Sequence, residues 1–481
     1  MDLLIGIDLG TTKVKCGVFN TDGKLLSFSS EGYEIYLDES KKEAMADPLI
    51  WYDAVRKVLK RSLDGLRYNK ISGISVGSHG PSLVMIDEKG FPVFDSMIWL
   101  DRRAVKESKI LSDRTGLHID PSWNIPKAMW IKKNKPDFYK KVKWFCQPLD
   151  YVCYKLTGSI TLSVCSDQID AWRNEEIYSS GIDEKLFPVK VKMGEFICEV
   201  SKKVSFETAV PQGTPVYAGT GGADFVEALI GTDSLSFCKV CDRAGTSQGI
   251  NVCAKVKEKI KGFFCVDHPL LKDYHHIGGM ISTTGKSLEW FKNGFCYNNM
   301  SYCDAVKEAS FSPLGAKGLF FLPHLSGSRT PWWDSYSKGV YFGINLNQDK
   351  RDFLRALLEG IAYEMKLILD ICRDHGIRAE KIISCGAQAK NDPWNQIKAN
   401  VIGLPVMIPE IIEAETLGMA IIAGYGAGVF KSIPKASKEL VKIKKVFKPQ
   451  KADNKKYNEL FKIYQKLYPS LKDLFKLSEF V

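Results

Sequence analysis

The sequence has no long hydrophobic run, although hydrophobic residues make up 45% of its 481 residues. No apolar stretch approaches the ~20 residues that a membrane-spanning helix needs. Met1 and Asp2 lack the positive charge with which a signal peptide begins, and the apolar stretch behind them is too short for one. We therefore expect a cytoplasmic protein with no membrane partner. The length predicts two or three domains at roughly 100–200 residues each.

The cysteines form no regular framework. There are thirteen, an odd number, scattered along the chain, and without an export signal this usage is typical of a reducing compartment. Cys238 and Cys241 have C-x-x-C spacing, but they fall in an alternating strand pattern without a second pair at ligand distance. We do not expect a metal there.

The C-terminal segment lacks arginine. Residues 431–481 contain fourteen lysines and account for most of the net charge of +11. Nucleic-acid sites depend on the arginine fork for bases and phosphates. Lysines alternate with apolar residues at helical spacing over residues 457–475, so we favour a docked helix with a solvated lysine face and expect no nucleic-acid partner.

The first apolar run ends in a turn suited to an anion. Residues 3–9 lead into Gly10-Thr11-Thr12, and an alternating pattern follows over residues 13–19, which predicts a hairpin. Gly10 lets the backbone approach a phosphate closely, and the two threonines add hydroxyl donors. An ordinary edge hairpin is the alternative interpretation.

Charged residues flank this turn. Asp8, at the end of the first strand, is suited to a hydrated Mg²⁺ ion, which prefers carboxylate and water ligands. Lys15, on the second strand, adds positive charge beside the turn.

A similar hairpin recurs in the second half of the chain. An apolar alternation leads into Gly245-Thr246-Ser247 and continues beyond it, 235 residues after Gly10. This repeat predicts an internal duplication in which each half carries its own phosphate loop.

Polar loops follow two further strands of the first half. One strand ends at Ser78-His79-Gly80, and a short apolar run over residues 96–100 ends at Asp101. In α/β sheets ligands bind at such strand ends. A turn histidine with local partners remains the alternative interpretation of His79.

A glycine-rich loop precedes Asp224. The loop follows a strand and leads into a helix, so capping alone would explain an acid at this position. The functional interpretation is that the glycines clear space for a substrate beside a carboxylate that accepts a hydroxyl proton.

The second half contains two recognisable elements. Apolar residues recur at three- and four-residue steps over 354–372 and stop at His375-Gly376, which predicts an amphipathic helix. Residues 381–385 then read as a strand that leads into a loop of small residues, suited to a flat base lying against backbone.

Together these segments resemble the FGGY family of carbohydrate kinases over nearly the whole chain. The matching segments, in order, are a first phosphate motif at residues 8–15, sugar-side segments at 77–87 and 99–103, the family's catalytic aspartate at Asp224, a second phosphate motif at 245–247, a Leu-Pro…Gly-x-Arg-Thr-Pro loop at 322–331 and an adenosine motif at 385–391. Each motif alone is weak, and six in order are specific.

The resemblance implies an α/β fold of two duplicated, actin-like (ribonuclease H-like) domains that face each other across a cleft for ATP and sugar. The expected domains are residues 1–242, for sugar binding and catalysis, and residues 243–481, for nucleotide binding. A helix of small residues, 415–424, is expected behind the adenosine motif.

The resemblance also implies roles for individual residues. Asp224 is the expected catalytic base, and Asp8 is expected to act with Mg²⁺ held through water. The expected ATP-binding residues are Gly10, Thr11, Thr12, Lys15, Gly245, Thr246, Gly285, Gly386, Ala387 and Asn391. The expected sugar-binding residues are Ser78, His79, Gly80, Asp101 and Asp224.

The chain departs from the family pattern on the sugar side. Xylulokinases commonly have Gln-Met-His-Gly where this chain has residues 77–81, so that His79 falls at the family's Gln. The Arg-Glu pair of glycerol kinases would fall on Gly80 and Pro81, which disfavours glycerol. Ser328 and Cys385 also replace a usual acid and a usual glycine.

The predicted function is therefore an ATP-dependent carbohydrate kinase acting on a ketose, with D-xylulose or a related pentulose favoured. Another sugar or polyol (ribulose, erythritol or a hexulose), a catalytically silent sensor of sugar or nucleotide, and an actin-like assembling ATPase are the alternatives. A homodimer is left open.

Overall fold

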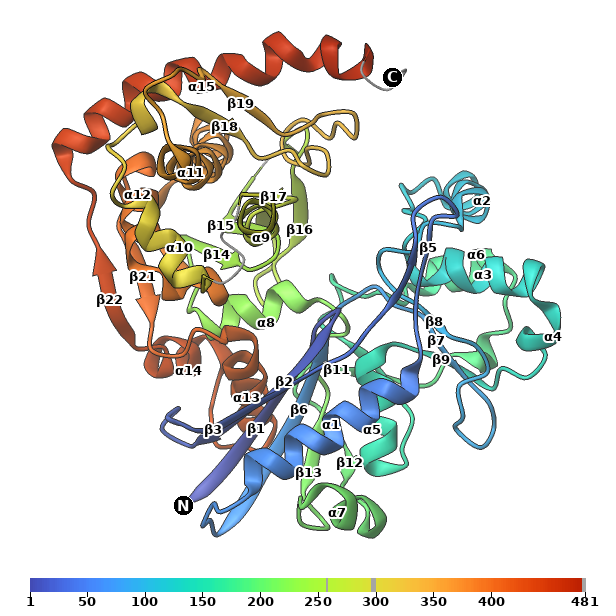
Figure 1. Cartoon of the computed structure of the whole chain (residues 1–481). Helices are drawn as coiled ribbons and strands as arrows, with labels where there is room; N and C mark the ends of the chain where they lie inside the picture. Colours follow the sequence, from blue (N-terminus) through green and yellow to red (C-terminus); the bar gives the residue numbers. More distant parts are fainter. Residues whose placement is uncertain (257, 296–299, 478–481) are drawn as a thin grey trace. The chain divides into compact units, whose positions relative to one another are not determined.

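The computed structural model describes residues 1–256, 258–295 and 300–477. The chain divides into two compact units (Figure 1). Unit 1 comprises Met1–Gly231 and Ala414–Leu440, and unit 2 comprises Thr232–Glu413 and Val441–Val481. No helix among the described residues is both long and apolar enough to cross a membrane.

Unit 1 is built on a six-stranded mixed sheet in the order β12-β13-β6-β1-β2-β3. Strands β1, β2 and β3 form an antiparallel meander, β6 and β13 run parallel to β1, and β12 is antiparallel to β13. The bounds are β1 Asp2–Leu9, β2 Lys13–Asn20, β3 Leu25–Gly32, β6 Lys70–Ser78, β12 Phe196–Glu199 and β13 Pro215–Tyr217.

Unit 2 repeats this pattern in a seven-stranded sheet, β16-β17-β15-β14-β20-β21-β22. Strands β14, β15 and β17 are antiparallel, β20 and β21 run parallel to β14, and β22 is antiparallel to β21. The bounds are β14 Cys238–Ala244, β15 Gln248–Ala254, β16 Phe264–Asp267, β17 His275–Ile281, β20 Ala379–Cys385, β21 Val406–Pro409 and β22 Ile443–Phe447. The shared strand pattern confirms the predicted duplication.

Short strands and helices complete unit 1. The short strands pair as β4 Tyr36–Asp38 with β5 Glu43–Ala46 and β8 Ser96–Met97, β7 Val84–Ile86 with β9 Trp144–Cys146, and β10 Leu162–Val164 with β11 Lys190–Lys192. The helices are α1 Pro48–Leu63, α2 Val105–Thr115, α3 Asn124–Asn134, α4 Pro136–Tyr139, α5 Pro148–Thr157, α6 Asn174–Ser180, α7 Lys202–Thr208, α8 Asp224–Gly231, α13 Ala414–Gly426 and α14 Ile433–Leu440, with a 3₁₀ turn η1 at Glu184–Leu186.

The long helix predicted in the second half is α11, Lys350–Asp374. Asp349 caps it and forms a capping box with Asp352, which satisfies amide donors of the first turn. The other elements of unit 2 are α9 Gly285–Gly294, α10 Tyr302–Ala309, α12 Asp392–Ile402, α15 Lys451–Leu477, the pair β18 Phe320–Leu322 and β19 Val340–Phe342, and the 3₁₀ turns η2 Ala316–Gly318 and η3 Ala387–Lys390.

Helix α13 belongs to unit 1, although it follows the adenosine motif in sequence. It packs on β1, β6 and α8, so the expectation that residues 415–424 support the adenosine motif was wrong. Its buried face is apolar and small, with Leu417, Ala420 and Ile421 among its buried residues, and this pattern does not indicate which sheet it covers. The division into domains at residues 242/243 stays a prediction.

The C-terminal helix α15 docks on unit 2 as expected from its pattern. Its apolar residues, among them Tyr457, Phe461 and Tyr464, are buried in the cluster formed with α11 and β18. Exposed lysines such as Lys462 lie on its other face. The lysine-rich segment is therefore a solvated helix face, at least over the residues that the structure describes.

Candidate active site

The first phosphate hairpin forms as predicted in unit 1. Asp8 and Lys15 are cross-strand partners, and the amide of Gly10 donates to the carbonyl of Lys13 at 3.0 Å to close the turn. The Tyr33 hydroxyl donates to the carbonyl of Gly10. Thr12 at the tip is exposed, so its hydroxyl is available to a ligand.

A cluster of carboxylates lies beside this hairpin. Lys15 Nζ is 3.4 Å from Asp8 Oδ2 and 3.8 Å from Glu415 Oε2. Burial raises the pKa of Asp8 to about 7; Lys15 opposes this shift, and the negative charges of Glu415 and Asp224 add to it. The structure therefore brings Asp8, Lys15 and Asp224 together, as the sequence predicted.

Glu227 is a member of this cluster that the sequence analysis missed. It lies three residues after Asp224 on α8 and so shares its helix face. The Thr220 hydroxyl donates to Glu227 Oε1 at 2.7 Å. Burial, together with the charges of Asp8 and Asp224, raises the pKa of Glu227 well above its usual range. An isolated acid within the apolar helix pattern of residues 225–230 was the available signal.

The carboxyl of Glu227 takes up space that only a glycine leaves free. A Cβ on Gly77, near the end of β6, would lie 2.1 Å from Glu227 Oε1. The end of β6 and the start of α8 are thereby in direct contact, which brings the sugar-side loop next to the predicted base.

The donor set of this cluster fits a hard divalent cation. Asp8, Asp224 and Glu415 supply carboxylate oxygens, the ligands that Mg²⁺ prefers together with water. Burial is the main cause of the raised pKa of Asp8, and the negative charges of Glu415 and Asp224 add to it; a bound cation would oppose both effects.

The predicted sugar-side loop follows β6. His79 is 3% exposed, and its Nδ1 lies 3.0 Å from Ser82 Oγ. Its Nε2 and the hydroxyl of Ser78 are buried without a hydrogen-bond partner among the described residues. Burial, with a contribution from Lys127, lowers the pKa of His79 to about 3, so the ring is neutral. The contact with Ser82 agrees with the interpretation of His79 as a turn histidine with local partners. Its Nε2, which has no hydrogen-bond partner among the described residues, leaves the interpretation as a sugar-side residue open.

Gln147 joins this loop to the glycine loop before Asp224. Its side-chain amide donates to the carbonyl of Gly221 at 2.6 Å, and its Oε1 accepts from the amide of Ser82 at 3.4 Å. It is fully buried at the N-cap of α5. No local pattern in the sequence indicates this role, because the contact joins three segments far apart in the chain.

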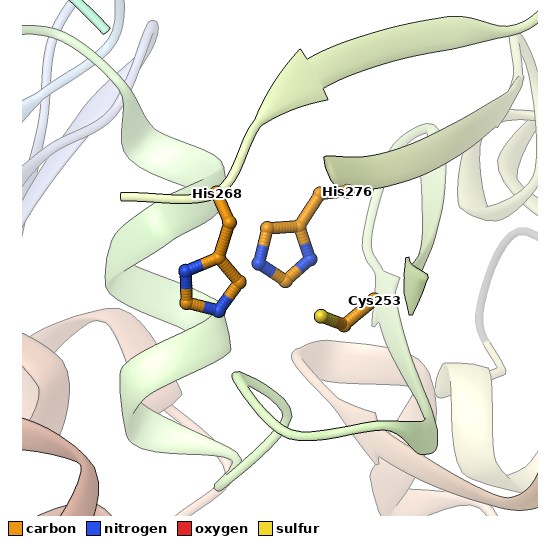
Figure 2. Close-up of side chains that lie close together, drawn as sticks. All are labelled: Cys253, His268 and His276. Atoms are coloured by element: carbon orange, nitrogen blue, oxygen red, sulfur yellow. The ribbon is translucent and has the colours of Figure 1, made fainter. Parts of the chain in front are cut away.

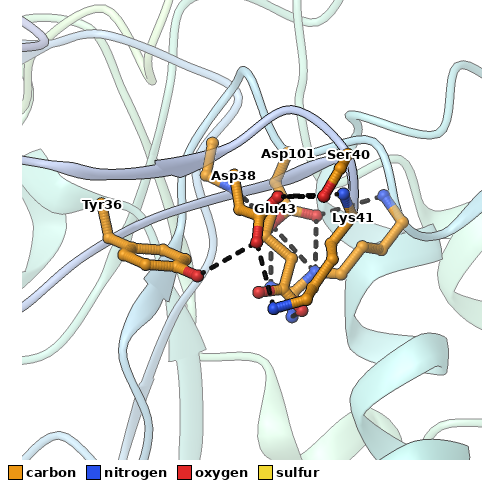
Figure 3. A network of polar contacts seen from close by, with 8 residues as sticks. Tyr36, Asp38, Ser40, Lys41, Glu43 and Asp101 are labelled. Atoms are coloured by element: carbon orange, nitrogen blue, oxygen red, sulfur yellow. Dashed lines mark hydrogen bonds and ion pairs between the residues drawn. The ribbon is translucent and has the colours of Figure 1, made fainter.

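Asp101 is a buried member of a polar network that also includes the exposed residues Tyr36 and Lys41 (Figure 3). Its carboxylate accepts from Arg103, with Nη2 at 2.8 Å, and from the amide of Ala44 at 3.0 Å. Arg103 also reaches Glu43 at 3.2 Å. These partners hold the segment that follows β8, and direct contact of Asp101 with a sugar stays a prediction.

The same segment reaches the phosphate hairpin through Trp99. The indole Nε1 donates to Thr11 Oγ1 at 2.9 Å. This contact places the hydroxyl of a predicted phosphate-binding threonine against the sugar-side segment within unit 1.

In unit 2 the predicted nucleotide residues lie around the second hairpin. The amides of Thr284 and Gly285 donate to the carbonyls of Thr246 and Gly245, both at 3.1 Å. A Cβ on Gly285 would lie 2.5 Å from the carbonyl oxygen of Gly245. Gln388 donates to the same carbonyl at 2.9 Å, so the start of α9 and η3 meet at this turn.

Ala387 is the first residue of η3, and Gly386 and Asn391 flank this turn. The amide of Gly386 donates to the carbonyl of Ile412 at 2.8 Å, and Ala387 is exposed. Asn391 begins α12, and its Oδ1 is buried without a hydrogen-bond partner among the described residues. The structure therefore brings the predicted adenosine residues and the second phosphate turn together in one unit.

A buried ion pair supports the second phosphate turn. Lys398 Nζ donates to Asp242 Oδ2 at 2.9 Å, and both side chains are 0% exposed. Ser384 donates to the same oxygen and Gln248 to Oδ1, at 2.7 and 2.6 Å. Asp242 lies on β14 three residues before Gly245, and neither it nor Lys398 was predicted from the sequence.

Unit 2 also holds a buried cluster of Cys253, His268 and His276 (Figure 2), whose ligand-type atoms lie within 4.8 Å of one another. His268 Nε2 lies 2.9 Å from the carbonyl of Leu235, and its Nδ1 accepts from the amides of Leu270 and Leu271 at 3.0 and 2.9 Å. Because two amides point at Nδ1, the proton is on Nε2, and neither nitrogen has a lone pair for a metal. We assign this cluster a structural role.

Two family models match the chain. The model described as the FGGY family of carbohydrate kinases, N-terminal domain, matches residues 3–231, and that of the C-terminal domain matches residues 243–427.

Full-length relatives agree with these matches. The chain is 29% identical to a xylulose kinase of Bacillus subtilis (strain 168), with 98% of each chain covered. It is 26% identical to a gluconokinase of the same organism, over 90% of this chain and 89% of the relative. Among solved structures, a ligand-bound xylulose kinase from Lactobacillus acidophilus has the same fold, with a TM-score of 0.85, 21% identity and full coverage of both chains.

Proposed function

The chain belongs to the FGGY family of carbohydrate kinases and is an ATP-dependent phosphotransferase with an alcohol acceptor, and from this premise we propose that the acceptor is a ketose, D-xylulose or a related pentulose. The observation that supports the proposal most is the carboxylate cluster of unit 1, in which burial and the charges of Glu415 and Asp224 raise the pKa of Asp8 beside the Gly10–Thr12 turn.

We assign Asp224 as the base that accepts the proton of the sugar hydroxyl. A carboxylate cannot remove a proton from an alcohol in the ground state, so the proton moves as the oxygen attacks phosphorus and its charge develops. Burial raises the pKa of the neighbouring Glu227 well above its usual range, which favours its protonated form over a second negative charge near the incoming phosphoryl group. Base assistance of this kind contributes about 10²–10⁴-fold.

We assign the phosphate contacts to both hairpins. In unit 1 the backbone at Gly10, the hydroxyls of Thr11 and Thr12 and the ammonium of Lys15 face the donor phosphates. In unit 2 the turn at Gly245 and Thr246 has this role, and Gly285, Gly386, Ala387 and Asn391 bind the adenosine. Positioning and electrostatic stabilisation are the main contributions to phosphoryl transfer.

Asp8 would hold Mg²⁺ through water, with Glu415 as its neighbour in the cluster. When bound, the cation neutralises charge on the phosphate oxygens. Lys15, paired with both carboxylates, keeps the charge of the cluster partly balanced.

We assign Ser78, His79, Gly80 and Asp101 to the sugar side. The neutral ring of His79 offers Nε2, and Ser78 offers a hydroxyl, both without partners among the described residues. A polyhydroxylated acceptor would supply the missing hydrogen bonds. The departure from the xylulokinase pattern lies in this loop, so gluconate or another sugar is the second candidate, favoured by the gluconokinase relative.

The test is ADP release across ketopentoses, ketohexoses, polyols and gluconate. We expect a ketopentose, D-xylulose first, to give the highest kcat/KM. Asp224→Asn should lower kcat with the best acceptor by about 10²-fold or more, while Asp64→Asn, an exposed acid at the end of α1, should match wild type.

The outcomes separate the assignments. A preference for gluconate or a polyol would contradict the proposed ketose acceptor but not the proposed kinase site. An Asp224→Asn variant with the kcat of wild type would contradict the assignment of Asp224 as the base. No ADP release with any acceptor would favour the alternative that the protein is a catalytically silent sensor. The cytoplasmic location expected from the sequence stays a prediction, and the homodimer stays open.

A further inference from the structure

Lys127 on helix α3 is a fully buried lysine that the proposed chemistry does not use. Its side chain is 0% exposed. Its ammonium donates three hydrogen bonds, to the carbonyls of Pro81 at 3.0 Å, Met97 at 3.1 Å and Ile98 at 2.9 Å. A lysine ammonium has three donors, so all of them are used and all of them end on backbone.

This arrangement differs from that of the other fully buried lysine. Lys398 in unit 2 is compensated by the carboxylate of Asp242 at 2.9 Å. Lys127 forms no ion pair with a described residue, and the charges that favour its ammonium, Asp101 and Asp120, act at longer range. A buried charge without a partner is costly, and a methionine or leucine would fill the same space without that cost. A function of the three bonds would explain why the charge is there.

The three carbonyls belong to two segments that are far apart in the sequence. Pro81 lies in the sugar-side loop, between His79 and its partner Ser82. Met97 is the last residue of β8, and Ile98 follows it and leads directly into the segment of Trp99 and Asp101. Lys127 therefore joins the two segments that carry every sugar-side residue except Asp224.

Helix α3 makes a second contact with the same segment. Trp130, three residues after Lys127 and so on the same helix face, lies under the guanidinium of Arg103, with 4.6 Å between the ring centre and the guanidinium carbon. Arg103 in turn binds Asp101. Residues 127 and 130 of α3 thus fix both ends of the segment from residue 97 to residue 103.

We propose that Lys127 is a positioning residue for the acceptor sugar: its ammonium holds the loop of Ser78–Gly80 at a fixed distance from the segment of Asp101 through three backbone carbonyls. The proposal rests on the assignment of these two segments to the sugar side. It assigns Lys127 no contact with the sugar and no part in phosphate binding.

The charge of Lys127 adds a second, independent readout. The groups that face it are His79, Asp101, Asp120, Arg102 and Arg103. Burial lowers the pKa of Lys127 to about 7, while Asp101 and Asp120 oppose this and the two arginines add to it. His79 is neutral throughout, since its pKa is about 3. A neutral amine has two donors, so one carbonyl loses its hydrogen bond as pH rises.

The test measures KM for the acceptor and for ATP separately, with the best acceptor of the panel above, whichever sugar it is. Lys127→Met removes all three bonds at similar volume. Because misplacement of a binding group by about 1 Å can cost about 100-fold, we expect the acceptor KM to rise by about 10- to 100-fold while the ATP KM stays within about 2-fold. Lys133→Met, an exposed lysine on the same helix, is the matched control and should behave as wild type.

The pH profile gives the second measurement. In wild type the acceptor KM should rise as pH increases from about 7 to 9, with the ATP KM nearly constant, and Lys127→Met should lose this dependence. Lys127→Arg, which keeps the charge, should also show an acceptor KM independent of pH in this range.

Two results would overturn the proposal. One is a folded Lys127→Met enzyme whose acceptor KM stays within about 2-fold of wild type or whose two KM values rise together. The other, decisive if that variant does not fold, is a wild-type profile in which the acceptor KM is flat or moves in parallel with the ATP KM. A failure of the proposed function shows instead in the acceptor panel or in Asp224→Asn, neither of which involves Lys127.

Discussion

Removing Lys398 tests whether the buried ion pair under the second phosphate turn is as important as its geometry indicates. Asp242 and Lys398 are both 0% exposed and lie 2.9 Å apart. In Lys398→Met the carboxylate of Asp242 keeps the hydrogen bonds from Ser384 and Gln248 but loses its counter-charge. Breaking a buried pair on one side costs about 3–5 kcal/mol.

Differential scanning calorimetry measures this loss. In a domain of this size 1 kcal/mol shifts Tm by roughly 2–4 °C, so Lys398→Met should lower the Tm of the transition that contains unit 2 by roughly 6–20 °C. The ATP KM should rise as well, because Asp242 lies on β14, which ends at Ala244, directly before Gly245. The acceptor KM should change less.

Two further variants make the result interpretable. The double variant Asp242→Asn/Lys398→Met leaves no buried charge, so it should be more stable than Lys398→Met alone, and the difference gives the coupling of the pair. Lys462→Met removes an exposed pair on α15, whose side chains are 67% and 65% exposed, and should cost less than about 1 kcal/mol.

The reasoning is refuted if Lys398→Met costs less than about 1 kcal/mol. It is also refuted if the double variant is no more stable than the single one, since the cost would then come from lost packing of the lysine stem and not from an uncompensated charge.

Two more predictions concern the two phosphate hairpins. Gly285→Ala puts a Cβ 2.5 Å from the carbonyl oxygen of Gly245 and should raise the ATP KM about 10-fold or more in steady-state assays. The control is Gly294→Ala, at the other end of α9, where a Cβ would meet no atom within 4 Å. Equal effects of the two substitutions would contradict the steric argument. Asp8 has a pKa of about 7 in the folded protein against ~3.9 when unfolded, so the folded state loses stability as pH rises between these values. Asp8→Asn should therefore be more stable than wild type at pH 8, by at most about 4 kcal/mol, and this difference, followed as a difference in Tm, should be smaller at pH 5. The variant should be inactive or nearly so, because Asp8 is the proposed Mg²⁺ ligand. An equal stability difference at both pH values would contradict the raised pKa of Asp8.

Local sequence patterns were sufficient for the elements that carry the site. The two Gly-Thr turns, the strands on either side of them and helix α11 all follow from periodicity and turn chemistry, which act over a few residues. The predicted residues at Asp8, Lys15 and Asp224 also meet in unit 1, because strand ends and helix starts of one sheet edge lie together.

Contacts between distant segments were not predictable in this way. Helix α13 has the apolar composition of any buried helix, and the sequence placed it behind the adenosine motif, whereas it packs on β1 and β6. Gln147, Lys127 and Lys398 are single polar residues in apolar surroundings. Their roles depend on which carbonyl or carboxylate lies opposite, and no local pattern contains that information.

The sequence by itself determined the family, the duplicated α/β fold and the phosphate turns, because glycine, hydroxyl and carboxylate residues at fixed spacing define a backbone that binds phosphate. Tertiary structure alone decided how charge is distributed around those turns. Burial and neighbouring carboxylates raise the pKa values of Asp8 and Glu227, and a buried ammonium joins the two sugar-side segments. These effects depend on distances and desolvation, which arise only when the segments pack together.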